Sequence, residues 1–149
     1  MRLFRHHTGL PSDLRPAVVA IGNFDGVHLG HRRVIDMARD RARELDAPLA
    51  VLTFEPHPRS YFQPGTPPFR LTPFRSKAHQ FEMIGVDVLF VLSFDAAMAA
   101  LSAEQFVSDV LVKGLRARHV VVGYNFAFGH GRKGDVAQLR SLGGARRAL

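Results

Sequence analysis

The stretch Gly-Asn-Phe-Asp-Gly-Val-His-Leu-Gly-His, residues 22–31, joins two segments of different periodicity. The run before it, from Ala17 to Ile21, is continuously apolar, as in a buried strand, and the segment after it, from Arg32 to Leu45, has the spacing of an amphipathic helix. A glycine-containing turn between a strand and a helix directs backbone N–H groups and the positive end of the helix dipole at one point. The stretch therefore predicts a binding turn for phosphate.

Two histidines in this turn indicate what the phosphate would undergo. His28 and His31 lie three residues apart at the start of the helix, so both imidazoles can reach one bound anion, and Gly30 leaves room for it. This arrangement suits nucleotidyl transfer, in which a phosphate attacks the α-phosphorus of a nucleoside triphosphate in line. Such a reaction needs alignment and donors to the growing negative charge, and it needs no protein nucleophile.

Two other interpretations of the same stretch stay open. The turn could be a structural connection whose histidines are exposed polar caps, or both rings could bind a metal ion. The metal site is the weaker idea, because the chain has no cysteine and its sequence offers no obvious third ligand.

The stretch resembles the nucleotide-binding signature of the HxGH nucleotidyltransferases. Its Phe-Asp-Gly-Val-His form is similar to the adenylyltransferase domain of the prokaryotic bifunctional riboflavin kinase/FMN adenylyltransferases, also called FAD synthetases. Two further strings resemble that family in the expected order: Thr-Phe-Glu-Pro-His-Pro at 53–58, and the segment 122–135, which begins Val-Gly-Tyr-Asn-Phe-Ala-Phe-Gly. Together the matches span most of the chain from Ala17 onward, because the first string begins at residue 22 and the last ends at residue 135.

The resemblance implies a reaction of ATP with FMN that gives FAD and pyrophosphate, with Mg²⁺ bridging oxygens of the triphosphate. It assigns catalytic roles to His28 and His31. The nucleotide-binding residues that it implies are Gly22, Asn23, Phe24, Asp25, Gly26, Gly30 and Asn125. The flavin-binding residues that it implies are Phe54, Pro56, His57, Pro58, Phe62, Phe106 and Phe128. Periodicity alone makes Phe106 a core residue, and a glycine-rich surface hairpin is the alternative for the segment around Phe128.

The chain departs from the family pattern in three ways. It ends at Leu149, before a second signature of the Ser-Ser-Thr-x-x-Arg kind and before the riboflavin kinase domain, and Ala127 stands where the family often has arginine. We therefore expect residues 1–149 to be a single FMN adenylyltransferase domain that is truncated at its C-terminus. The alternatives are a homo-oligomer or second chain that completes the site, a flavin- or nucleotide-binding fragment without catalysis, and a nucleotidyltransferase with another phosphorylated acceptor.

Composition narrows the class of protein. A chain of 149 residues with 46% hydrophobic content can build one domain core. The lack of cysteine fits a reducing compartment, and the sequence has neither a signal peptide nor a run long enough to span a bilayer, so we expect a cytoplasmic protein without a membrane partner. The formal charge of +7 fits small phosphorylated substrates as well as it fits nucleic acid or a membrane surface, and a compositional bias toward arginine explains it too. Because the basic residues form no stripe with interleaved aromatics, we expect no nucleic-acid partner.

The pattern along the whole chain predicts the fold. Buried strands are expected at 17–21, 48–54, 87–94 and 119–123, and helices at 32–45, 72–85 and 102–113, with a last short helix capped at 135–138. Strands that alternate with helices give parallel βαβ units, hence an α/β fold with a Rossmann-like doubly wound parallel sheet. All three strings follow the ends of expected strands, where open α/β sheets bind ligands.

Overall fold

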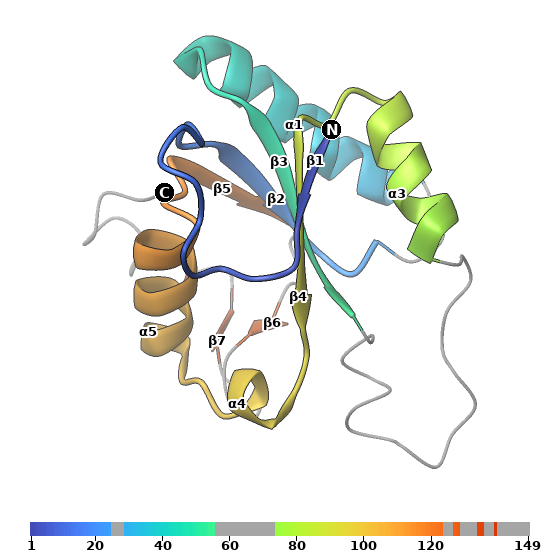
Figure 1. The fold of residues 1–149 in the computed structure, drawn as a ribbon. Helices are drawn as coiled ribbons and strands as arrows, with labels where there is room; N and C mark the ends of the chain where they lie inside the picture. The colour runs from blue at the N-terminus through green and yellow to red at the C-terminus, as the bar shows by residue number, and fades with distance from the viewer. Residues whose placement is uncertain (25–28, 56–73, 124–126, 129–133, 136–138, 140–149) are drawn as a thin grey trace.

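The centre of the fold is a five-stranded parallel sheet with the order β1-β4-β3-β2-β5 (Figure 1). The structure is a computed structural model that describes residues 1–24, 29–55, 74–123, 127–128, 134–135 and 139. The strands of this sheet are β1 (Arg2–Phe4), β2 (Val18–Ile21), β3 (Leu49–Glu55), β4 (Val88–Ser93) and β5 (His119–Val122). The predicted α/β class and parallel sheet are confirmed.

The three inner strands form because both of their faces can be buried. Every residue of β2 is buried, as are all but the last residues of β3 and β4. Continuous apolar strands of this kind are typical of parallel sheets that are covered on both sides. In the register, Ile21 pairs with Leu52 of β3 on one side and with Val122 of β5 on the other. The first and third sequence strings therefore leave the sheet from neighbouring strands.

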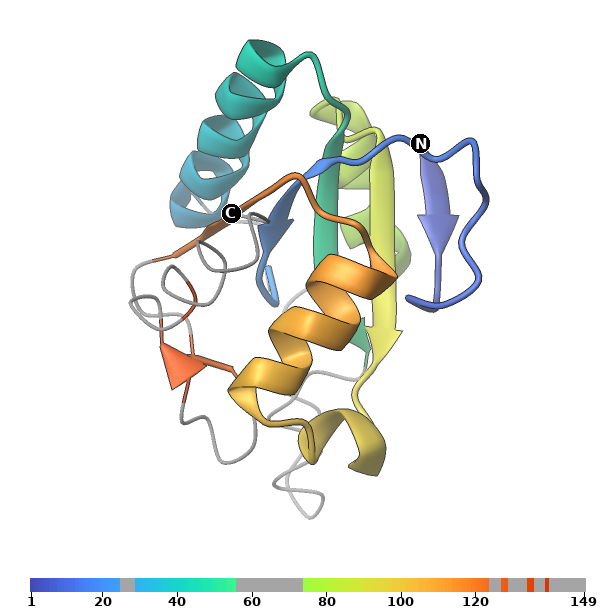
Figure 2. The same ribbon diagram turned by 90° about the vertical axis from the view of Figure 1, so that its left-hand side faces the viewer.

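Helices cover both faces of the sheet (Figures 1 and 2). On one face, α1 (Leu29–Leu45) contributes Ile35 and α3 (Phe74–Met83) contributes Phe81, and both side chains are fully buried. On the other face, α5 (Ala103–Gln105) leads into η2 (Phe106–Gly114), a π-helix that contributes Val107. A capping box begins α5, because Ser102 and Gln105 exchange hydrogen bonds. A short helix, α4 (Ala96–Ala99), precedes α5.

The structure differs from the sequence prediction at several elements. α1 begins at Leu29 rather than at Arg32, and η2 is a π-helix rather than the continuation of an α-helix. β1 is an additional edge strand, which pairs with β4 and stacks Phe4 on Phe90 with ring centroids 5.8 Å apart. Asp135 lies in a strand, and Leu139 is helical, while residues 136–138 and Thr72 lie outside the described residues.

The order of the strands places the ligand-binding end of the sheet. The crossovers from β2 to β3 and from β3 to β4 contain α1 and α3 and move along the sheet in one direction. The crossover from β4 to β5 contains α5 and η2 on the opposite face and moves the other way. Reversing both face and direction preserves the handedness of the connection. The winding therefore changes direction beside β2, and open α/β sheets bind ligands beyond the carboxyl ends of strands at such a point.

Within the described ranges, no helix has the length and apolar character needed to cross a membrane.

Candidate functional site

The turn after β2 begins with a close approach between Gly22 and the Phe24 ring. The Gly22 N–H donates to the Leu52 carbonyl at 3.1 Å, which ends the pairing of β2 with β3. A Cβ atom on Gly22 would lie 3.0 Å from Cζ of Phe24, so any larger residue would push against the phenyl ring. Gly22 therefore lets the chain fold Phe24 back onto the end of its own strand.

Phe24 occupies a backbone conformation that is unusual for its type. Its φ is +54°, in the left-handed region, and its side chain is 2% exposed. A non-glycine residue in this region costs about 1–3 kcal/mol, and such strain persists only where the surroundings determine it. Here the surroundings are the aromatic contacts of the ring and the hydrogen bonds of the preceding peptide.

The Phe24 ring links the turn to two helices. It lies edge-on to the His31 ring of α1, with centroids 5.3 Å apart, and edge-on to Phe81 of α3 at 5.6 Å. Edge-to-face aromatic pairs contribute roughly 0.5–1.5 kcal/mol beyond the area that they bury. The contact also limits the orientation of the His31 ring, which is half-buried in the first turn of α1.

The carbonyl group of Asn23 accepts two side-chain hydrogen bonds. Nζ of Lys77, on α3, donates at 3.0 Å, and Oγ1 of Thr53, on β3, donates at 3.2 Å. Thr53 is fully buried and Lys77 is 1% exposed, so both polar groups are held in the interior by hydrogen bonds. We call this pair, Thr53 and Lys77 on the Asn23 carbonyl, the Asn23 clamp.

The second sequence string begins at the carboxyl end of β3, where two of the predicted flavin residues are core side chains. Phe54 is 8% exposed and lies edge-on to Phe94 at 5.7 Å. Phe106, at the start of η2, is 4% exposed, and its ring lies 6.5 Å from that of Phe54. Both belong to the core under η2, as periodicity indicates for Phe106. Their role toward a flavin stays a prediction.

The third string contains a small antiparallel pair. β6 (Ala127–Phe128) pairs with β7 (Gly134–Asp135), with Phe128 opposite Gly134. The glycine-rich stretch 129–133 joins these two strands and lies outside the described residues. The backbone pairing fits both the flavin-binding role implied for Phe128 and the surface hairpin that the sequence leaves open.

Some of the predicted site residues lie close together in the structure, and others lie outside the described residues. Gly22, Asn23, Phe24 and His31 gather at the carboxyl end of β2, beside the backbone of Gly30 in α1. The predicted site residues that lie outside the described residues are Asp25, Gly26, His28, Pro56, His57, Pro58, Phe62 and Asn125.

Two members of the site have no predicted role in the sequence analysis. Thr53 lies in the second string, where its hydroxyl gives no sign that it reaches Asn23. Lys77 can be noticed in the sequence, because it is three residues after Phe74 and four before Phe81. This spacing places it on the apolar side of its helix. A lysine at such a position indicates a buried polar partner.

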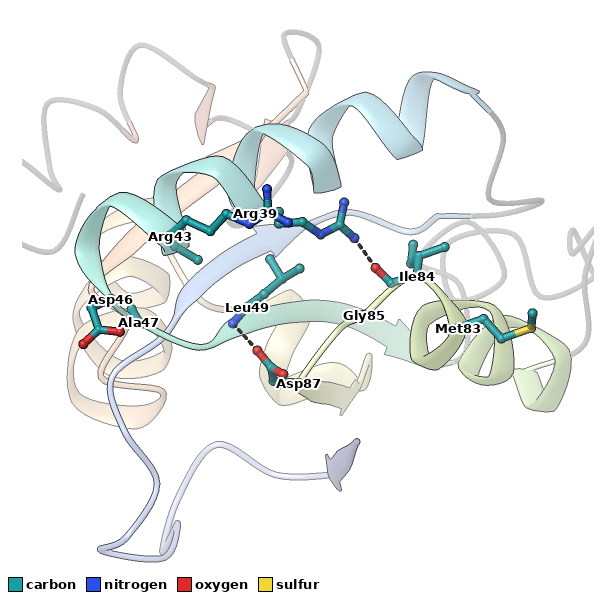
Figure 3. Close-up of a pocket in the computed structure, with 10 residues that line it drawn as sticks. Arg39, Arg43, Asp46, Ala47, Leu49, Met83, Ile84, Gly85 and Asp87 are labelled. Carbon is teal, nitrogen blue, oxygen red and sulfur yellow. Dashed lines mark hydrogen bonds between the residues drawn. The ribbon is translucent and has the colours of Figure 1, made fainter.

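A groove of about 520 Å³ lies at the other end of the sheet, beside the starts of β3 and β4 (Figure 3). Two of its polar side chains are used within the fold: Arg39 donates to the Ile84 carbonyl, and Asp87 accepts the Leu49 N–H at 2.9 Å. These bonds join α1 and β3 to the segment between α3 and β4, so the groove is part of the packing between elements. The candidate site therefore lies at the carboxyl ends of the strands and not in this groove.

The fold and its motifs agree with known proteins. The family model described as FAD synthetase matches residues 10–147. Three relatives named bifunctional riboflavin kinase/FMN adenylyltransferase are similar: from Escherichia coli (strain K12), 43% identical over 85% of this chain and 40% of the relative; from Pseudomonas fluorescens, 43% over 96% and 46%; and from Bacillus subtilis (strain 168), 39% over 90% and 42%. The chain thus spans less than half the length of these relatives.

A solved structure shares the fold. A crystal structure named for a macrolide-efflux protein from Streptococcus pneumoniae superposes with a TM-score of 0.80 and 24% sequence identity, over 94% of this chain and 46% of that one. At this identity the likeness concerns the arrangement of strands and helices alone.

Proposed function

This chain belongs to the FAD synthetase family, and we propose that residues 1–149 form a domain that transfers the adenylyl group of ATP to FMN, giving FAD and pyrophosphate. The observation that carries the proposal is the convergence of the three sequence strings. Ile21 pairs with both Leu52 and Val122, so the strings that follow β2, β3 and β5 start side by side where the winding of the sheet reverses.

The reaction is one in-line displacement. An oxygen of the FMN phosphate forms a bond to the α-phosphorus of ATP, and the bond from that phosphorus to the oxygen bridging the α- and β-phosphates breaks, so that pyrophosphate leaves with its electron pair. Catalysis by the protein then consists of alignment and of donors to the charge that grows on the transferring phosphate. His31, in the first turn of the 17-residue helix α1, can supply such a donor beside the positive end of the helix dipole. His28 is proposed for the same role.

Mg²⁺ belongs to the proposal as the ion that neutralises triphosphate charge. Among the described residues, no three or more histidine, aspartate or glutamate side chains gather as a possible metal site. Mg²⁺ commonly binds through substrate phosphates and one or two carboxylates rather than through a full protein cage. An ion that arrives bound to ATP therefore needs no such group of side chains. A cytoplasmic location is part of the same proposal.

The acceptor is tested by competition. The purified chain is incubated with ATP, Mg²⁺ and FMN, and FAD is separated by chromatography while other phosphorylated metabolites are added in excess. We expect FAD formation that these compounds do not inhibit. Inhibition together with an adenylylated form of the competitor would show that the acceptor is another phosphorylated compound.

A further inference from the structure

The Asn23 clamp determines which way the peptide between Asn23 and Phe24, in the turn after β2, faces. Its donors come from separate elements, Thr53 from β3 and Lys77 from α3, and both side chains lie in the interior. In a trans peptide the carbonyl and the N–H of the next residue point in opposite directions. With the Asn23 carbonyl directed at these two donors, the N–H of Phe24 is directed away from them.

We propose that Lys77 is a positioning residue which, with Thr53, locks the Asn23–Phe24 peptide so that the Phe24 N–H faces the phosphates of the bound nucleotide. This inference rests on the proposed function. Without the lock, the peptide could rotate and place the Asn23 carbonyl oxygen toward the phosphates, where the two negative groups would repel each other. The lock also explains how Phe24 keeps its left-handed φ of +54°.

The position of Lys77 supports a role beyond packing. Lys77 and Phe81 are the buried residues of α3, four residues apart on one face of that helix. Phe81 contacts the Phe24 ring, and Lys77 holds the peptide just before Phe24. Burying an amino group has a desolvation cost that an apolar side chain of similar length would avoid. The hydrogen bond to the turn gives a reason for a lysine at this place.

Four variants separate positioning from stability. Lys77→Met keeps an unbranched side chain one heavy atom shorter and removes the donor, and Thr53→Val keeps the shape and removes the hydroxyl. Thr53→Ser keeps the hydroxyl and serves as the conservative partner. The control is Val86→Ala, because Val86 is 3% exposed in the same core as Phe81 and is no part of the clamp.

Each variant is measured in three ways: its melting temperature, its kcat and KM for ATP in FAD formation, and the ¹⁵N–¹H signal of the Phe24 amide with and without ATP. We expect Lys77→Met and Thr53→Val to lower kcat/KM for ATP by about tenfold or more and to reduce the ATP-induced shift of the Phe24 signal. Thr53→Ser should retain both properties. Val86→Ala should lower the melting temperature and leave kcat/KM unchanged.

The outcome distinguishes this inference from the proposed function. A folded Lys77→Met with wild-type kcat/KM and a wild-type Phe24 shift would overturn it, and if Lys77→Met does not fold, Thr53→Val against Thr53→Ser decides in the same way. A wild-type chain in which ATP shifts the Phe24 amide but no FAD forms would contradict the proposed function and support the clamp. FAD formation without any response of the Phe24 amide to ATP would support the proposed function and overturn the inference about the clamp.

Discussion

The ring of Phe24 lies edge-on to the ring of His31, with centroids 5.3 Å apart and an interplanar angle of 80°. Phe24 belongs to the turn after β2, and His31 to the first turn of α1. The contact therefore joins the backbone that would receive the phosphates to an imidazole that would donate to them. Disturbing the ring should change the orientation of that imidazole without removing it.

Replacing Phe24 with leucine tests this coupling. We expect Phe24→Leu to lower the free energy of unfolding by about 1–2 kcal/mol, because volume is lost in a buried place, and also to lower kcat for FAD formation. The matched control is Phe90→Leu, since Phe90 is 1% exposed in the core on the other face of the sheet. Equal unfolding free energies with a loss of kcat in Phe24→Leu alone would support the coupling, and equal kcat values would refute it.

Adding one methyl group at Gly22 should disturb the same ring from the other side. The new Cβ would lie 3.0 Å from Cζ of Phe24, so we expect Gly22→Ala to destabilise the fold by about 1–3 kcal/mol and to reduce kcat/KM for ATP. Gly9→Ala is the comparison. Its Cβ would meet nothing within 4 Å, and its φ of +64° strains the backbone far from the site, so stability should fall while kinetic parameters stay at wild-type values.

The imidazole of His31 is expected to act on the transferring phosphate. Removing one donor to developing charge commonly lowers kcat by about 10²–10³-fold, and we expect this loss in His31→Asn with little change in KM for ATP. His28→Ala should abolish turnover with the fold intact. His79→Asn, at an exposed position on α3, should leave kcat unchanged. Wild-type kcat in His31→Asn would remove His31 from the reaction.

His119 makes the stability of the fold depend on pH. Burial and the positive charge of Arg41 lower its pKa from 6.5, against the opposing effect of Glu44. The unfolded chain then binds more protons than the folded chain between that lowered pKa and about 6.5. The free energy of unfolding should therefore fall as the pH drops below about 6.5, measured by denaturant titration at several pH values. This decrease in the free energy of unfolding should be smaller in His119→Asn. If the variant and the wild type show the same dependence on pH, His119 is not its cause.

The sequence predicts four of the five strands of the main sheet, because β2, β3, β4 and β5 are apolar runs. It does not predict β1, since Arg2–Phe4 is a three-residue edge strand with two exposed residues and no periodicity to detect. It also cannot separate a π-helix from an α-helix over 106–114, because the two place apolar residues at similar spacings.

The sequence singles out candidate site residues where the residue types carry chemistry, as at His31 and Gly22, and their roles stay predictions. The Asn23 clamp is harder to predict, because it depends on contacts between residues that are 30 and 54 positions apart in the chain. A buried lysine on an apolar helix face is the one sign of it in the sequence, and that sign gives no partner. Only the packing of α3 against the turn supplies the partner.

The most direct test of the central claim is the amount of FAD and of pyrophosphate that the purified 149-residue chain forms from FMN, ATP and Mg²⁺, with a parallel FMN titration. We predict FAD and pyrophosphate in equal amounts, and neither product when FMN is left out. Saturable binding of FMN with no FAD would contradict the claim and would make this chain a flavin-binding module without catalysis.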